Sequence, residues 1–209
     1  MVGLLVWVGI ATLTLPAALN LALIVGGVAL TVPLAWLGRR ALDRQPTADR
    51  VVWVTTLVHY GVLIPLGVAL LRAVSTYPDW AGWTLPLPRA LGWLLVLPTG
   101  AAALLAVANL AWKGWGAPFA IALSQKLSVE WLYAWTRNPM VLATLAFLVA
   151  LGLWFQSALF VLWVLGVVAP ALLVFVKVYE ERELELRFGA AYRDYKARTP
   201  LLFPRRPRR

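Results

Sequence analysis

The residues whose types and spacing suggest chemistry lie in the C-terminal part of the chain. Arg137 precedes Asn138-Pro139, and a run of carboxylates begins at Glu180. A guanidinium pairs with an anion, a carboxylate pairs with a cation, and the ring of Tyr133 can face a cation. Asn138 before Pro139 is also typical of a helix start, where free backbone N–H groups can bind an anion. Together these groups suit a ligand that carries both positive and negative charge.

The composition argues against several other kinds of chemistry. The chain has no cysteine and a single histidine, His59. Thiolate nucleophiles, Cys/His metal sites and histidine-based triads are therefore not expected, and no metal is predicted. His59 lies in an apolar run, where an ionisable side chain is a functional candidate by default. We expect a neutral imidazole bonded to another helix and assign His59 no role.

One position stands out in the carboxylate run. At 100° per residue, an apolar helical stripe joins Glu180, Leu184, Phe188, Ala191 and Tyr195. A carboxylate on the apolar stripe of a helix leaving a membrane costs free energy unless it meets a cation or hydrogen-bond donors. We therefore single out Glu180, and expect Glu181, Glu183 and Glu185 to form a solvated charge run.

The elements that must position these residues are transmembrane helices. Hydrophobic residues make up 62% of the 209 residues, charged residues 13%, and the mean hydropathy is +0.79. This is too little polar surface for a water-soluble domain. The net charge of +10 does not indicate nucleic acid, because the charges lie between apolar runs. We predict an all-α, polytopic transmembrane bundle with about five spans, near residues 17–37, 51–73, 88–112, 138–154 and 157–178.

The distribution of positive charge predicts the topology. With five spans, only Arg72 and Arg89 of the 19 Lys and Arg residues fall on one side of the membrane. The positive-inside rule then places the C-terminus in the cytoplasm and the N-terminus outside. Residues 2–37 exceed one span, and a break at Pro16 and Asn20 leaves an additional N-terminal half-span open.

We expect a single membrane domain over residues 1–209. Its N-terminal spans occupy residues 1–112. Residues 113–209 hold a loop, the last two-span hairpin and a C-terminal helical segment. The terminal Arg205-Arg206-Pro207-Arg208-Arg209 is expected to bind anionic headgroups of membrane lipids.

Two segments resemble the signatures of one family. Gly116-Ala117-Pro118-Phe119 and then residues 126–140, which end in Arg137-Asn138-Pro139-Met140, are similar to the first signature of the isoprenylcysteine carboxyl methyltransferase and phospholipid N-methyltransferase family of integral membrane methyltransferases. The second signature is matched by Glu180-Glu181-Arg182-Glu183-Leu184, by residues 188–195, and by Pro200 and Pro204. The resemblance covers about residues 113–204.

The resemblance implies an S-adenosylmethionine-dependent methyltransferase whose acceptor is lipid-like or partitions into the membrane, with a carboxylate or an amine as the methylated group. It implies catalytic roles for Arg137 and Glu180. The implied cofactor contacts are Leu127, Ser128, Tyr133, Asn138, Pro139, Met140, Val141 and Glu180.

The family often has His where Asn138 stands, with Asn a familiar variant. Two further positions depart from the family pattern. Val141 stands where the family usually has Tyr, and Val176, with Lys177 beside it, stands where carboxyl methyltransferases bind substrate through an Arg. The second departure argues against a prenylcysteine carboxylate as the acceptor. A membrane NADPH-dependent sterol-type reductase has a similar Arg-x-Pro pattern, and a non-catalytic protein that retains the fold is a further alternative. Cofactor preference separates these three functions.

Overall fold

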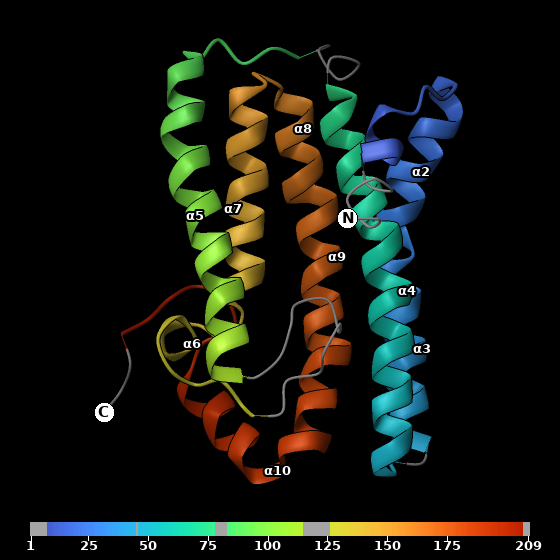
Figure 1. Cartoon of the computed structure of the whole chain (residues 1–209), viewed down its shortest axis with the longest axis vertical. Helices are drawn as coiled ribbons and strands as arrows, with labels where there is room; N and C mark the ends of the chain where they lie inside the picture. The colour runs from blue at the N-terminus through green and yellow to red at the C-terminus, as the bar shows by residue number, and fades with distance from the viewer. Residues whose placement is uncertain (1–7, 45, 78–82, 115–125, 207–209) are drawn as a thin grey trace.

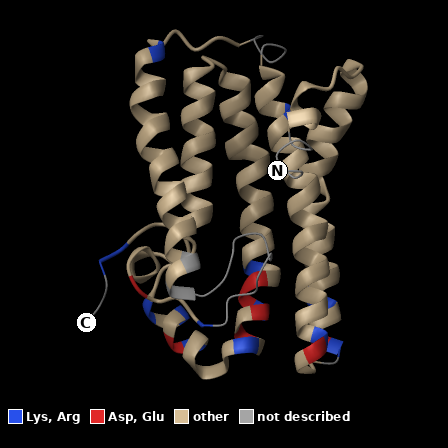
Figure 2. Cartoon of the chain, viewed as in Figure 1, with Lys and Arg blue, Asp and Glu red and all other residues tan. Residues whose placement is uncertain are grey.

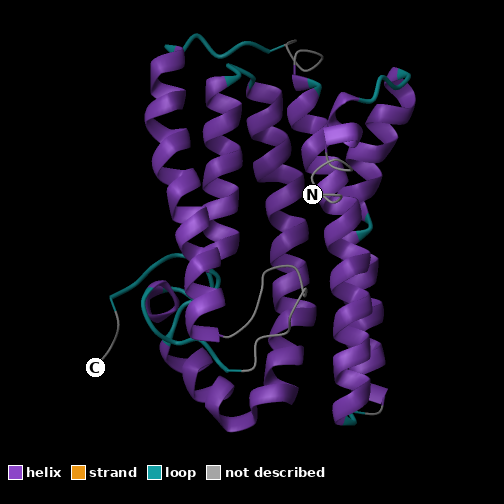
Figure 3. Ribbon diagram, in the orientation of Figure 1, coloured by secondary structure: helices purple, strands orange, loops and turns teal. Residues whose placement is uncertain are grey.

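The computed structural model describes residues 8–44, 46–77, 83–114 and 126–206, and its regular structure there is helical, with one isolated β-bridge between Thr84 and Ser157 (Figures 1 and 3). The helices before the last hairpin are α2 (Ala17–Ala29), α3 (Thr31–Arg44), α4 (Ala48–Ser75), α5 (Arg89–Gly114) and α6 (Leu132–Trp135). The hairpin begins with α7 (Pro139–Trp154). A continuous helical segment follows, composed of α8 (Ala158–Trp163), η3 (Val164–Val168), α9 (Ala169–Val174), η4 (Phe175–Glu180) and α10 (Glu181–Arg198).

The long helices stand side by side as an elongated bundle (Figure 3). Four of them are long and apolar enough to cross a membrane, namely Ala17–Arg44, Ala48–Ser75, Arg89–Asn109 and Ala158–Arg198. The apolar α7 has 16 residues, a length of about 24 Å. The prediction of an all-α polytopic bundle is confirmed, and α7 is the shortest of its five apolar segments.

Two predicted boundaries between apolar segments, at Pro16 and after α7, coincide with interruptions of the helical structure. Residues 8–12 are helical, residues 13–16 are not, and α2 follows Pro16 directly, so the chain does break at Pro16. Residues 1–7, which belong to the proposed half-span, lie outside the described residues. The hairpin after α7 turns through Gln156, which has a φ of 57°. The predicted tight turn there is confirmed.

Two hydrophobic clusters join the N-terminal helices to the last hairpin. Near one end, Ile24 of α2 and Leu66 of α4 pack with Leu148 of α7 and Phe160 of α8. Toward the other end, the second cluster joins α3, α4 and η4 through Ala35, Leu42, Val51, Val58, Val62, Phe175 and Tyr179. The second cluster therefore fixes η4, the turn of helix that carries Glu180.

Gly38 permits the close packing of α3 against η4. A Cβ atom at this position would lie 2.6 Å from Val58 Cγ2 and 2.8 Å from two ring carbons of Tyr179. Tyr179 is fully buried and precedes Glu180 in the chain. The absence of a side chain at Gly38 therefore determines how closely α3 approaches the helix that carries Glu180.

The predicted apolar stripe through Glu180, Leu184, Phe188, Ala191 and Tyr195 is wrong. The turn Phe175–Glu180 is π-helical, and Gly189, with φ 54° and ψ −125°, bends α10. Neither segment keeps 100° per residue, so the face changes along the helix. The buried residues of α10 are Glu181, Glu183, Tyr192 and Tyr195.

Charged residues gather at one end of the bundle, where α10 lies beside the start of α4 and the end of α3 (Figure 2). Between the two ends, the helices are almost free of charge in this view. This pattern agrees with a bundle whose middle lies in the hydrocarbon of a membrane.

We expect Gly38→Ala to lower stability by about 1–3 kcal/mol, because the added methyl group overlaps Val58 and the Tyr179 ring. The matched control is Gly26→Ala on the neighbouring helix, where a Cβ meets nothing within 4 Å. Thermal unfolding of the detergent-solubilised proteins measures both. Equal unfolding temperatures for the two variants would contradict the close packing of α3 on η4.

Candidate active site

An ion pair joins the two signature segments. Arg137 Nη2 lies 3.0 Å from Glu181 Oε1, and each side chain is 11% exposed. The other carboxylate oxygen of Glu181 lies 2.6 Å from Lys196 Nζ. The loop before α7 is thereby attached to the start of α10 and, through Lys196, to its last turns.

The expectation that Glu181 and Glu183 are solvated is wrong. Glu181 is buried between Arg137 and Lys196, and Glu183 is buried with Arg187 Nη1 2.5 Å from its Oε1. Burial raises the pKa of Glu183 and outweighs the opposing effect of Arg187. The π-helical turn before α10 and the bend at Gly189 direct these carboxylates inward. Glu185, whose side chain is 25% exposed, remains near the surface.

Lys196 belongs to the same charged cluster. Its ammonium lies 3.0 Å from Glu185 Oε1 as well as 2.6 Å from Glu181. Burial disfavours the charged form, but the hydrogen bonds to Glu181 and Glu185 outweigh it and raise the pKa of Lys196. Lys196 therefore stays charged at neutral pH and supports Glu181 in facing Arg137.

The C-terminal tail is hydrogen-bonded to the first signature. The Arg137 N–H donates to the Pro200 carbonyl at 2.9 Å, and the Asn138 side-chain amide donates to the Leu201 carbonyl at 2.9 Å. The Arg205 N–H donates to the Trp135 carbonyl at 3.0 Å. Asn138 does precede Pro139 at the start of α7, but its side chain makes no capping hydrogen bond there. It holds the tail instead.

Glu180 faces a residue from the N-terminal half of the chain. His59 Nε2 on α4 lies 3.7 Å from Glu180 Oε1, while His59 Nδ1 lies 2.8 Å from the Thr55 carbonyl of its own helix. Glu180 on η4 lies just beyond hydrogen-bond distance, so the expected hydrogen bond from His59 to another helix is not found among the described residues. Sequence reasoning missed this pairing, and the one signal for it was an ionisable side chain within an apolar run.

Tyr133 lies within the electrostatic influence of Glu180. Burial raises the pKa of Tyr133, and the charge of Glu180 raises it further. The Tyr195 hydroxyl donates to the Tyr133 backbone carbonyl at 2.7 Å. The phenol of Tyr133 thus remains protonated near the carboxylate.

The other sequence-predicted residues divide into two groups. Leu127, Met140 and Lys177 are at least partly exposed, whereas Ser128, Pro139 and Val176 are buried. Val141, at the position where the family has Tyr, packs against the first hydrophobic cluster. Of the two substrate positions, Val176 is 2% exposed, so Lys177 is the one that reaches open space.

The buried polar atoms that have no hydrogen-bond partner among the described residues include Nε and Nη1 of Arg137 and Oγ of Ser128. Unsatisfied buried donors cost about 1–3 kcal/mol each, which favours a ligand that accepts from them. The guanidinium edge of Arg137 that is not paired with Glu181 is therefore suited to an anionic group.

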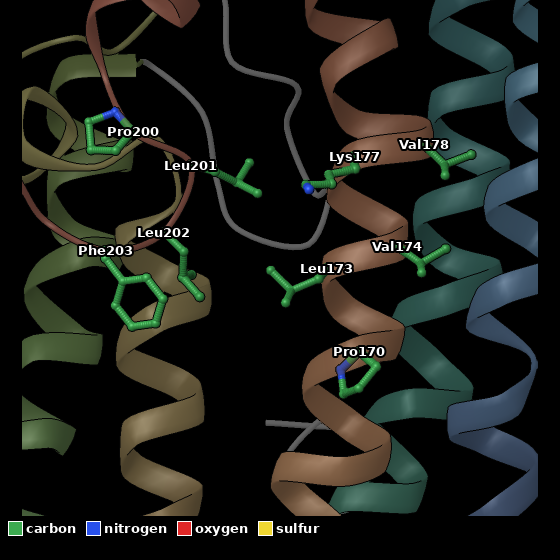
Figure 4. Close-up of a pocket in the computed structure, with 9 residues that line it drawn as sticks. All are labelled: Pro170, Leu173, Val174, Lys177, Val178, Pro200, Leu201, Leu202 and Phe203. Atoms are coloured by element: carbon green, nitrogen blue, oxygen red, sulfur yellow. The ribbon is translucent and has the colours of Figure 1, made fainter.

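A pocket of about 590 Å³ lies between the α9–η4 segment and the C-terminal tail (Figure 4). One wall consists of Pro170, Leu173, Val174, Lys177 and Val178, and the other of Pro200, Leu201, Leu202 and Phe203. In Figure 4, Leu173 and Lys177 project toward Leu201 across the space. The pocket is apolar apart from the ammonium of Lys177, and the bond from Asn138 to Leu201 holds its second wall.

Within the described residues, no group of three or more His, Asp or Glu side chains is placed to hold a metal ion. The charged groups of the site pair with one another instead, as Glu181 does with Arg137 and Lys196. The site therefore offers charges and hydrogen-bond donors to a charged organic ligand.

Comparison with known proteins identifies the family. The phospholipid methyltransferase family matches residues 87–191, just over half of the 209 residues. No curated protein and no solved structure matches the chain. The matched range runs from the start of α5 into α10 and contains both Arg137 and Glu181. The chain belongs to the phospholipid methyltransferase family.

Proposed function

We propose that this protein transfers a methyl group from S-adenosylmethionine to a lipid-like acceptor that lies in the membrane and carries an amine or a carboxylate. The observation that carries the proposal is the junction of the two signatures, where Arg137 is paired with Glu181 and two of its buried nitrogens have no partner in the part of the chain that the structure describes. Family membership supports methyl transfer as the reaction class.

The residues of the site fit the charges of this cofactor. S-adenosylmethionine supplies an electrophilic methyl carbon on a positively charged sulfur, together with an ammonium and a carboxylate. Arg137 Nε and Nη1, with Ser128 Oγ, would bind the carboxylate, and Glu180 would pair with a positive group. Leu127, Tyr133, Pro139 and Met140 would contribute contacts around them.

Asn138 and Val141 have different roles in the proposal. Asn138 acts by holding the tail through Leu201, which keeps the wall of the pocket in place. Val141 packs into the core, so the contact that Tyr makes at this position in the family is absent here. Arg137 and Glu180 remain the residues to which we assign the chemistry.

The acceptor would be bound by the apolar pocket. Its walls of Leu, Val, Pro and Phe suit a hydrocarbon chain, and Lys177 can pair with a phosphate or carboxylate of a headgroup. Lys177 rather than the buried Val176 is therefore proposed to contact the acceptor. Methyl transfer needs alignment of two reactants and exclusion of water, and both are favoured by a pocket of this kind.

The proposed orientation follows from the positive charges. The end of the bundle that carries α10 and the signatures holds most of the Lys and Arg residues, which favours a cytoplasmic location for that end and for the C-terminus. A cytoplasmic site would also have direct access to S-adenosylmethionine.

We expect purified protein in detergent to bind S-adenosylmethionine and its demethylated product with micromolar affinity, measured by calorimetry. Glu180→Ala removes a charge-assisted interaction of about 1.5–3 kcal/mol, so affinity should fall by about 10- to 100-fold. Asp194→Ala, which removes an exposed carboxylate of the same helix, is the matched control and should bind normally.

NADPH distinguishes the methyltransferase from a reductase of similar pattern. Folded protein that bound NADPH, but neither sulfur compound, would overturn the proposed function. Binding of the sulfur compounds that Glu180→Ala leaves unchanged would retain the cofactor and remove Glu180 from its site.

The proposed orientation is tested with single cysteines, since the chain has none of its own. Pro86→Cys lies at one end of the bundle and Arg206→Cys toward the other, and both positions are exposed. In intact cells, a membrane-impermeant maleimide is expected to label Pro86→Cys and to leave Arg206→Cys unmodified until the membrane is permeabilised. The reverse pattern would place the site outside the cytoplasm.

A further inference from the structure

His59 is the one histidine of the chain, and it lies outside the range that matches the family. Its Nδ1 atom is 2.8 Å from the Thr55 carbonyl oxygen. A carbonyl oxygen accepts hydrogen bonds and cannot donate them, so Nδ1 carries a proton in both charge states of the ring. Nε2 is therefore the atom that gains and loses a proton.

Nε2 points toward Glu180, with 3.7 Å between Nε2 and Oε1. When the ring is neutral, two acceptor atoms face each other, and a proton on Nε2 turns this contact into an ion pair. Glu180 approaches from η4 and Glu183 lies next to it on α10, while Phe175 and Tyr179 present their rings 5.6 and 5.7 Å from the imidazole. The surroundings are thus apolar apart from the carboxylates.

The pair is accessible from one side. The His59 side chain is 14% exposed and that of Glu180 is 28% exposed, so a ligand beside Glu180 can reach the imidazole. Oε1 of Glu180 faces His59, which leaves Oε2 for a positive group of the cofactor. The Glu180 carboxylate can therefore interact with the imidazole and with the cofactor at the same time.

We propose that His59 is a catalytic residue that removes a proton from the amine headgroup of a phospholipid acceptor. This proposal rests on the proposed function. The N–H bond of the acceptor ammonium breaks, Nε2 gains the proton, and the electron pair stays on the acceptor nitrogen. That pair then forms the N–C bond to the methyl group, while the C–S bond breaks with its electrons on sulfur. The imidazolium is stabilised by Glu180 until water removes its proton.

The neighbouring groups are poorer proton acceptors. Tyr133 is held in its protonated form by burial and by the charge of Glu180. Arg137 and Lys177 are cations, and Glu181 is paired with Arg137 and Lys196. Among these groups, the imidazole alone offers an accessible ring nitrogen that can take up and release a proton.

His59→Gln tests the proposal, because glutamine keeps an N–H group but cannot take up a proton. With vesicles of phosphatidylethanolamine and phosphatidylglycerol and with S-adenosylmethionine, we expect methyl transfer at neutral pH to fall about 100-fold or more. The deficit should shrink as the pH rises and the amine loses its proton unaided. Affinity for S-adenosylmethionine, measured by calorimetry, should stay the same.

Tyr60→Phe, at an exposed neighbouring position of α4, is the control and should retain wild-type rates. A loss in His59→Gln that is equal at every pH would indicate a structural role and overturn the proposal. Wild-type protein that binds S-adenosylmethionine but does not methylate phosphatidylethanolamine would overturn it too. Absence of S-adenosylmethionine binding would instead contradict the proposed function.

A readout independent of turnover comes from ¹⁵N-histidine labelling, which gives one imidazole in the nuclear magnetic resonance spectrum. We expect the neutral ring to carry its proton on Nδ1, and the Nε2 resonance to move when Glu180→Gln removes the facing charge. A neutral ring protonated on Nε2, or an Nε2 chemical shift that is the same in the wild type and in Glu180→Gln, would contradict the proposal.

Discussion

The ion pair between Arg137 and Glu181 is the contact on which the site depends. It connects the loop before α7 to the start of α10, two segments separated along the chain by a complete transmembrane hairpin. A buried ion pair gains little net stability over an apolar contact, but losing one partner costs about 3–5 kcal/mol because the other charge stays buried. The pair therefore specifies one arrangement of the two segments, and Lys196 and the C-terminal tail reinforce it.

The N-terminal half of the protein takes part in the same arrangement. Arg39 donates to the Val178 carbonyl at 3.3 Å, and Asp43 lies 2.7 Å from both Arg39 and Arg182. Gly38 brings α3 against Tyr179. These contacts hold η4 and the start of α10 against α3 and α4, although α3 and α4 lie outside the family match. The consequence for function is that an N-terminal residue, His59, can act at a site formed mainly by the C-terminal half.

Much of the fold can be predicted from the sequence, because the length of each apolar run and the distribution of Lys and Arg between the runs can be read without knowing which segments pack together. The five apolar segments, the break at Pro16, the turn at Gln156 and the two signatures are all visible as patterns. The burial of Glu181 and Glu183 is not, because it depends on cations supplied by distant segments and on a helix that departs from 100° per residue. The approach of His59 to Glu180 was equally inaccessible, since it requires the packing of α4 on η4.

A double-mutant cycle tests most directly whether the Arg137–Glu181 pair organises the cofactor site. Affinity for S-adenosylmethionine would be measured for the wild type, Arg137→Gln, Glu181→Gln and the double variant. If the pair organises the site, the effects are not additive, the coupling is about 0.5–3 kcal/mol, and the double variant binds little worse than Arg137→Gln alone. Additive losses, or a Glu181→Gln variant with unchanged affinity, would contradict this account.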